Sequence, residues 1–150
     1  MNAIATELET LIDKYLSQLN SINDTDLSHK SLPAKWSKKE LIGHLIDSAQ
    51  NNIRRFIVAR YEEDPTITYQ QDNWVAINNY QQWESNHLIQ LWYFLNRQMV
   101  YILKNIPAEV SQRTCNTGTS YTIEWLAQDY IKHLKHHIHP VLNMEPVAYP

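Results

Sequence analysis

Four of the chain's seven histidines lie in one short stretch, DYIKHLKHHIHP, from Asp129 to Pro140. Successive residues of a helix are ~100° apart around its axis, so His133 and His137 lie on the same side. His136 lies on the flank of that side, and His139 points away from it. Because two histidines four residues apart can bind one metal ion, the pair predicts part of a metal site. The alternative is a polar run on the solvated face of the helix.

A third ligand is required, since two histidines rarely hold a catalytic metal. His44 is the best candidate, because it lies in a polar strip with Ser48, Asn52 and Arg55, beside the apolar side of an expected helix. Polar groups near a buried face need partners, and a hydrogen-bonded core histidine is the alternative for His44. Arg55 is ~16 Å along the helix from His44, too far to touch the same ion, and we expect it to pair with an acidic neighbour.

Four segments with helical periodicity carry these residues. They run from about Ala3 to Asn23, from the S-x-x-E capping box at Ser37 and Glu40 to about Ala59, from about Trp83 to Asn105, and from an N-cap at Thr122 to about His139, where Pro140 ends or kinks the helix. The segment from about Arg60 to Gln82 is too long for a tight turn, and we expect a short helix around Trp74 within it. Four amphipathic helices of ~20 residues predict an all-α four-helix bundle.

The topology follows from the positions of the histidines along the axes of their helices. His44 is ~10 Å from the start of its helix and His133 is ~16 Å from the start of the last helix, with His137 near its end. The three come level only if the second and fourth helices are antiparallel. An up-down-down-up bundle satisfies this condition, with the long crossover joining the parallel second and third helices.

The bulk composition is that of an ordinary globular domain, and we expect residues 1–150 to form one domain. Hydrophobic residues make up 43% and charged residues 19% of the 150 residues. The net charge is −3 without a basic tail, which argues against nucleic-acid binding. We find no apolar run of the ~20 residues needed to span a membrane and no signal peptide, and the single Cys115 fits a cytoplasmic location. We expect Cys115 to be a loop residue rather than a nucleophile.

The motifs WSKKELIGHL and HLKHH, separated by the crossover and the third helix, together resemble the DinB superfamily of YfiT-like four-helix proteins. The resemblance covers nearly the whole chain. It implies a zinc or nickel ion bound by His44, His133 and His137, an up-down-down-up bundle, and a small-molecule substrate. Some members resemble transferases or isomerases that use a low-molecular-weight thiol such as bacillithiol, mycothiol or glutathione. Pro140 departs from the family pattern, in which the last helix continues past the second histidine.

Acidic and aromatic residues near these ligands are further candidates. Asp47 and Asp129 lie one turn from His44 and His133, where they either orient the imidazoles or are ordinary helix-surface charges. His29 and His136 are expected on the surface. Candidates for a substrate pocket, from the crossover and the start of the third helix, are Tyr69, Asp72, Trp74 and His87.

Three functions are compatible with three histidines on one divalent ion, since open coordination positions remain. An ionised thiol at the metal would make a thiol-dependent S-transferase, which the resemblance favours. Activated water would make a metal-dependent hydrolase. A non-catalytic helical module, such as a homodimer whose histidines hold the bundle or bind a small ligand, is the third possibility. The residues alone do not choose among them.

Overall fold

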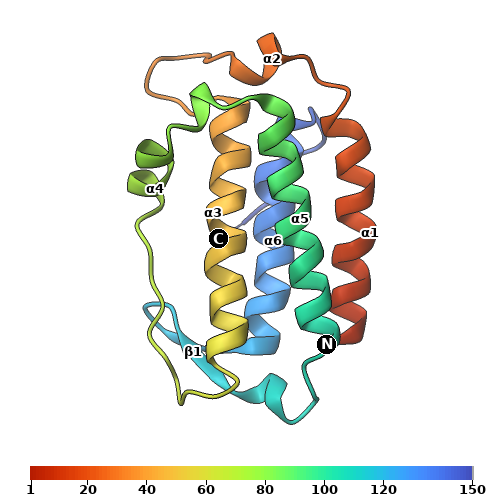
Figure 1. The fold of residues 1–150 in the computed structure, drawn as a ribbon, viewed down its shortest axis with the longest axis vertical. Helices are drawn as coiled ribbons and strands as arrows, with labels where there is room; N and C mark the ends of the chain where they lie inside the picture. Colours follow the sequence, from red (N-terminus) through yellow and green to blue (C-terminus); the bar gives the residue numbers. More distant parts are fainter. Residues whose placement is uncertain (150) are drawn as a thin grey trace.

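Four long helices lie side by side in the computed structural model, which describes residues 1–149 (Figure 1). They are α1 (Asn2–Leu19), α3 (Lys38–Val58), α5 (Ser85–Lys104) and α6 (Ile123–Val141). α1 and α6 run in one direction and α3 and α5 in the other, so the predicted up-down-down-up order is confirmed. Among the described residues, none of the helices is long and apolar enough to cross a membrane.

The core forms where the apolar stripes of the four helices meet. α3 packs against both α5 and α6, and α1 packs mainly against α5. The spacing of three and four residues in α1 turns Leu8, Ile12 and Tyr15 fully inward, as the periodicity predicts. The largest fully buried side chains include Trp92 and Tyr130. Burial of these stripes fixes the helix rotations, and therefore the direction in which the polar strip of α3 points.

The capping box at the start of α3 is present. The Ser37 hydroxyl accepts a hydrogen bond from the Glu40 amide at 3.2 Å, and the Glu40 carboxylate accepts one from the Ser37 amide at 2.7 Å. Both interactions satisfy backbone donors that the first helical turn leaves free. The cap therefore fixes the beginning of α3 less than two turns before His44.

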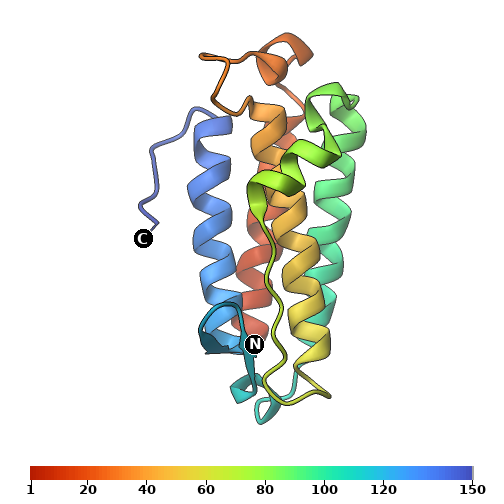
Figure 2. The same ribbon diagram turned by 90° about the vertical axis from the view of Figure 1, so that its left-hand side faces the viewer.

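The crossover between α3 and α5 runs along the outside of α3 (Figure 2). It contains α4 (Gln71–Asn78) and a short 3-10 helix, η1 (Tyr80–Gln82), which confirms the helix predicted around Trp74. The first part of the crossover is extended, and the Ile67 amide donates to the carbonyl of Asn116 at 2.9 Å. The crossover is thereby tied to the loop that precedes α6.

That loop holds a small antiparallel hairpin, β1 (Thr114–Asn116) and β2 (Ser120–Thr122). Its turn contains Gly118 at φ +110°, a conformation that side-chain-bearing residues rarely adopt. The sequence predicts the turn but not the strands, because three-residue strands are too short to show an alternating pattern. Cys115 is fully buried in β1.

Of two helix ends that the sequence predicts, one differs in the structure. α1 ends at Leu19 instead of Asn23, because the Asn23 side chain accepts from the Asp26 amide and caps a separate helix, α2 (Asp24–Ser28). α6 ends at Val141, one residue after Pro140, which confirms that the helix ends close to this proline. Proline removes one donor in the last turn, but the Leu142 amide still reaches the Ile138 carbonyl at 3.0 Å.

Candidate metal centre

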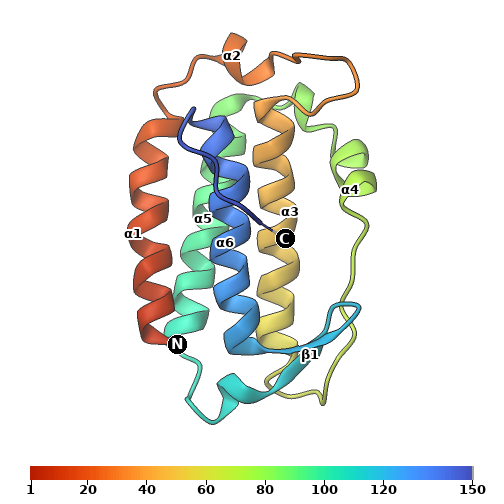
Figure 3. The same ribbon diagram turned by 180° about the vertical axis from the view of Figure 1, so that it is seen from behind.

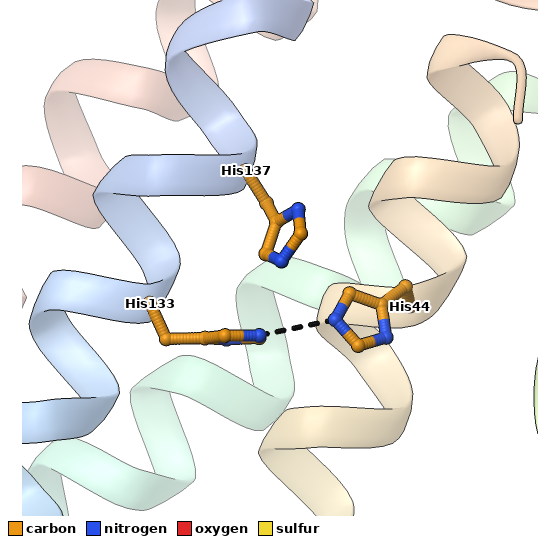
Figure 4. Close-up of side chains that lie close together, drawn as sticks. All are labelled: His44, His133 and His137. Carbon is orange, nitrogen blue, oxygen red and sulfur yellow. Dashed lines mark hydrogen bonds between the residues drawn. The ribbon is translucent and has the colours of Figure 1, made fainter. Parts of the chain in front are cut away.

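Three imidazoles converge between α3 and α6 (Figure 4). The Nε2 atoms of His44 and His133 are 3.0 Å apart, and one ring nitrogen from each of His44, His133 and His137 lies within 4.8 Å of the others. The antiparallel arrangement of α3 and α6 brings them together, as the height argument requires. Metal ligation by these residues stays a prediction.

The geometry and protonation of this cluster fit a divalent ion. Two nitrogens bound to one tetrahedral zinc at ~2.0–2.1 Å are ~3.3 Å apart, close to the separation of the His44 and His133 atoms. Burial, and then the neighbouring histidines, lower the pKa of His44 and of His137 to about 4 and that of His133 to about 2. The three rings are therefore neutral near pH 7, which is the form that binds a metal.

The Nδ1 atoms of His133 and His44 have a long hydrogen bond and no hydrogen bond, respectively. His133 Nδ1 lies 3.4 Å from the Ser48 hydroxyl. His44 Nδ1 is buried and has no hydrogen-bond partner among residues 1–149. The Trp36 ring packs against the His44 imidazole, with 5.3 Å between their centres. Packing, more than hydrogen bonding, holds His44 in place.

Asp47 takes neither of its two expected roles. Its side chain is fully buried, so it is not a surface charge, and it has no hydrogen bond to His44 in the structure. The carboxylate instead accepts from the Tyr80 hydroxyl at 2.6 Å and from the Asn78 amide at 3.3 Å. Burial raises the pKa of Asp47 to about 6, although the Tyr80 hydrogen bond opposes the rise. Through these two hydrogen bonds, Asp47 connects α3 to the crossover.

Gly43 makes this contact possible. A Cβ atom at this position would lie 2.0 Å from a ring carbon of Tyr80. The Tyr80 ring therefore rests directly on the backbone of α3, where no larger residue fits without a shift. This close approach aims the Tyr80 hydroxyl at Asp47.

Asp129 also has a partner other than the expected histidine. It accepts a hydrogen bond from the Tyr149 hydroxyl at 2.8 Å, because the C-terminal tail folds back along α6 (Figure 3). Under the same tail, His136 Nδ1 lies 2.7 Å from the carbonyl of Val147. The expectation that His136 is a surface residue is wrong, since the tail half-buries it. Because a carbonyl only accepts, His136 Nδ1 carries the proton in this bond.

A cavity of 540 Å³ opens beside the histidines, between α3, α6, the crossover and the tail. Two of the three clustered histidines, His133 and His137, line it. The other lining residues are Ser48, Asn52, Arg55, Thr68, Tyr69, Gln71, Thr117, Tyr121, Trp125, Leu126, Asp129, Tyr130, His136 and Tyr149. The volume is typical of a small-molecule site.

The proposed pocket residues lie in different places. Tyr69 lines the cavity, and Trp74 packs against Tyr69 with 5.6 Å between ring centres. Asp72 is exposed, and the His87 side chain is 73% exposed beside Glu84. The structure does not bring Asp72, Trp74 or His87 into the cavity.

Four aromatic residues that line the cavity were not among the predicted pocket residues: Tyr121, Trp125, Tyr130 and Tyr149. Tyr121 and Trp125 stack with their rings 3.8 Å apart, and their spacing of four residues at a helix start is a signal that could have identified them. Tyr149 lies in the irregular tail, where no periodic pattern indicates which residues face the cavity.

Comparisons with known proteins agree with this arrangement. The DinB superfamily matches residues 7–140. A protein of Halalkalibacterium halodurans named "Putative metal-dependent hydrolase" is 28% identical over 135 residues, which cover 88% of this chain and 78% of the relative. Relatives in Oceanobacillus iheyensis and Bacillus cereus carry similar names.

Two solved structures share the fold. YfiT from Bacillus subtilis, described as a "probable metal-dependent hydrolase with an unusual four-helix bundle topology", has a TM-score of 0.79 at 20% identity, covering 93% of this chain and 84% of YfiT. The mycothiol-dependent maleylpyruvate isomerase has a TM-score of 0.78 at 14% identity, covering 96% of this chain but 61% of that protein. At these identities the likeness shows the fold alone.

Proposed function

Because this chain belongs to the DinB superfamily, we propose that it is a metal-dependent hydrolase acting on a small molecule. The observation that carries the proposal is the convergence of His44, His133 and His137 at one side of a 540 Å³ cavity. The name of the Halalkalibacterium halodurans relative supports the same class of reaction.

The three histidines would hold the ion, and each has a distinct position. His44 is fully buried and approaches from α3, whereas His133 and His137 also line the cavity. A substrate in the cavity would therefore reach the ion past the α6 pair. A divalent ion held there would supply Lewis acidity and lower the pKa of a coordinated water toward neutral.

His136 is placed to move a proton in this reaction. It lines the cavity, and its ring centre is 4.8 Å from that of His137. Since Nδ1 donates to the Val147 carbonyl, Nε2 of the neutral ring has a free lone pair that can accept a proton. Asp129 also lines the cavity, and its carboxylate accepts a hydrogen bond from Tyr149. Outside the three-histidine cluster, His136 and Asp129 are the imidazole and the carboxylate among the described lining residues.

Hydrolysis of activated esters and amides by protein with and without metal tests the proposal. We expect a chelator to abolish turnover and zinc or nickel to restore it. His133→Ala should lower kcat/KM by ~1000-fold or more, because the ion loses a ligand at the cavity wall. His29→Ala, which changes an exposed histidine outside the site, is the control. Turnover that survives complete metal removal would overturn the proposal.

Thiol-dependent transfer is the second candidate, because the motifs resemble a superfamily in which some members use a low-molecular-weight thiol. Cys115 is buried and does not line the cavity, so the thiol would have to come from a separate molecule. The metal-loaded protein should then consume glutathione or bacillithiol together with an electrophile, and should not hydrolyse esters. A metal-containing protein that is inactive in both assays would instead favour the non-catalytic module.

A further inference from the structure

Arg55 lies in the same cavity, and its guanidinium group is held in place by neutral groups. Its Nε and Nη2 atoms donate to the carbonyl of Ile67 at 3.1 and 3.0 Å, and Nη1 donates to the Asn52 side chain at 3.3 Å. The Tyr69 ring lies 6.0 Å from the guanidinium carbon. These contacts use three of the five guanidinium N–H groups, and two remain for a ligand.

Contrary to the expectation from the sequence, Arg55 has no acidic partner. Among residues 1–149, no carboxylate lies within the 4.0 Å of an ion pair with Arg55. Asp129 shares the cavity, but its carboxylate accepts a hydrogen bond from Tyr149 instead. Asp129 is near enough to act electrostatically on Arg55 but forms no ion pair with it, so a bound anion could still contact the half-buried guanidinium group directly.

Arg55 and His44 lie at different heights along α3. Arg55 comes eleven positions after His44, which corresponds to ~16 Å between their backbone positions. Between them, Ser48 contacts His133 and Asn52 contacts Arg55. The cavity spans this length, since its α6 wall runs from Trp125 to His137. One molecule in the cavity can therefore reach the histidines at one end and Arg55 at the other.

We propose that Arg55 binds a carboxylate group of the substrate, at the end remote from the bond that is hydrolysed. The planar guanidinium group matches the two oxygens of a carboxylate, and its orientation is fixed before binding by the Ile67 carbonyl. The substrate class is thus an elongated small molecule with a terminal acid. This inference rests on the proposed function, because it takes the cavity as the substrate site.

Binding of a matched pair of probes to the zinc-loaded protein tests this inference. Suberic acid monohydroxamate carries a metal-binding head and a terminal carboxylate, and the corresponding terminal primary amide has the same length without the charge. We expect the acid to bind at least ~10-fold more tightly by calorimetry, because a hydrogen bond to a charged group is lost in the amide. Shorter homologues of the acid, which cannot span the cavity, should lose this preference.

Three variants test whether the acid preference comes from Arg55. Arg55→Gln keeps a donor for the Ile67 carbonyl and should bind the acid and the amide equally well. Arg54→Gln, which changes an exposed arginine outside the cavity, should keep the preference of the native protein. Arg55→Lys keeps the charge and should retain part of the preference even if Arg55→Gln folds poorly.

Repeating the titrations on metal-free protein separates this inference from the proposed function. Loss of the metal should weaken both probes but preserve the acid preference. Equal affinity for the acid and the amide in both forms would overturn the role of Arg55 and leave the metal site standing. Affinities that do not depend on the metal, with the acid preference intact, would overturn the metal site alone. Absence of binding in all titrations would overturn both.

Discussion

α3 carries two buried polar clusters, one toward the crossover and one toward α6, and they differ in what satisfies them. Toward the crossover, Asp47 Oδ1 receives hydrogen bonds from Tyr80 and Asn78, while Asp47 Oδ2 has no partner among residues 1–149. Toward α6, His44 meets two more neutral imidazoles, and its Nδ1 atom also has no partner among the described residues. Burial and an unsatisfied polar atom therefore do not by themselves mark a functional site. The feature that distinguishes the α6 side is the convergence of three neutral imidazoles that can share one metal ion.

Acid should affect the two clusters of the metal-free protein in opposite directions. The histidines have folded-state pKa values below the ordinary 6.5, so their contribution to stability is present above pH 6.5 and is lost as pH falls toward 4. The shift of His44 alone corresponds to ~3 kcal/mol. Chemical denaturation of metal-free Asp47→Asn protein, in which the opposing titration of Asp47 is absent, should show this loss between pH 8 and pH 4. Stability of this variant that stays constant over the range would contradict the burial of neutral histidines.

Gly43→Ala should be the most damaging single change on the crossover side. The new methyl group would lie 2.0 Å from the Tyr80 ring, so Tyr80 must move away from Asp47. We expect a loss of ~2–3 kcal/mol in the free energy of unfolding, despite the better helix propensity of alanine. If the variant is as stable as the native protein, the close packing of Tyr80 on α3 is not important.

Asp47→Asn should stabilise the protein at pH 7 by ~2 kcal/mol, because the raised pKa means that ionised Asp47 is unfavourable in the folded state. The stability that Asp47 contributes is present below its unfolded pKa of 3.8 and is lost as pH rises through about 6. The variant should lack this part of the pH dependence in urea titrations. A less stable variant with the native pH profile would show that the carboxylate is needed in its charged form.

Tyr80→Phe should have the smallest effect, a loss of ~1–2 kcal/mol, because Asp47 keeps its bond to Asn78. Removing the hydroxyl donor also raises the pKa of Asp47 further, which moves the pH dependence to higher pH. Thermal unfolding at several pH values would detect both changes, with Tyr121→Phe as a matched control on the far side of α3. An unchanged profile would argue against the Tyr80–Asp47 hydrogen bond.

The sequence predicts the arrangement of the helices and the positions of the histidines better than the partners of the other polar residues. Helical periodicity and the capping box place α3 and His44. The positions of His44, His133 and His137 along their helices require the antiparallel arrangement that the structure shows (Figure 1). These predictions succeed because they depend on local geometry. The tail that folds back after α6 could not be predicted, since its hydrogen bonds, such as the one from the Met144 amide to the His139 carbonyl, follow no periodic pattern.

The partners of the polar residues could not be predicted for the same reason. Asp47 lies one turn from His44 in sequence, but its partner Tyr80 comes from the far end of the crossover, where the pattern is irregular. Arg55 was expected to find an acidic neighbour, yet the crossover offers it the carbonyl of Ile67. Such pairings depend on how irregular segments pack, and no periodicity encodes them.

The metal content of purified protein tests the central claim most directly. The native protein and Asp47→Asn should each hold about one zinc or nickel ion per chain by elemental analysis, whereas His44→Ala should hold almost none. All three should show the same helical content by circular dichroism. Native protein without stoichiometric metal, or a folded His44→Ala protein that binds as much metal as the native one, would contradict the assignment of the three-histidine cluster as a metal site.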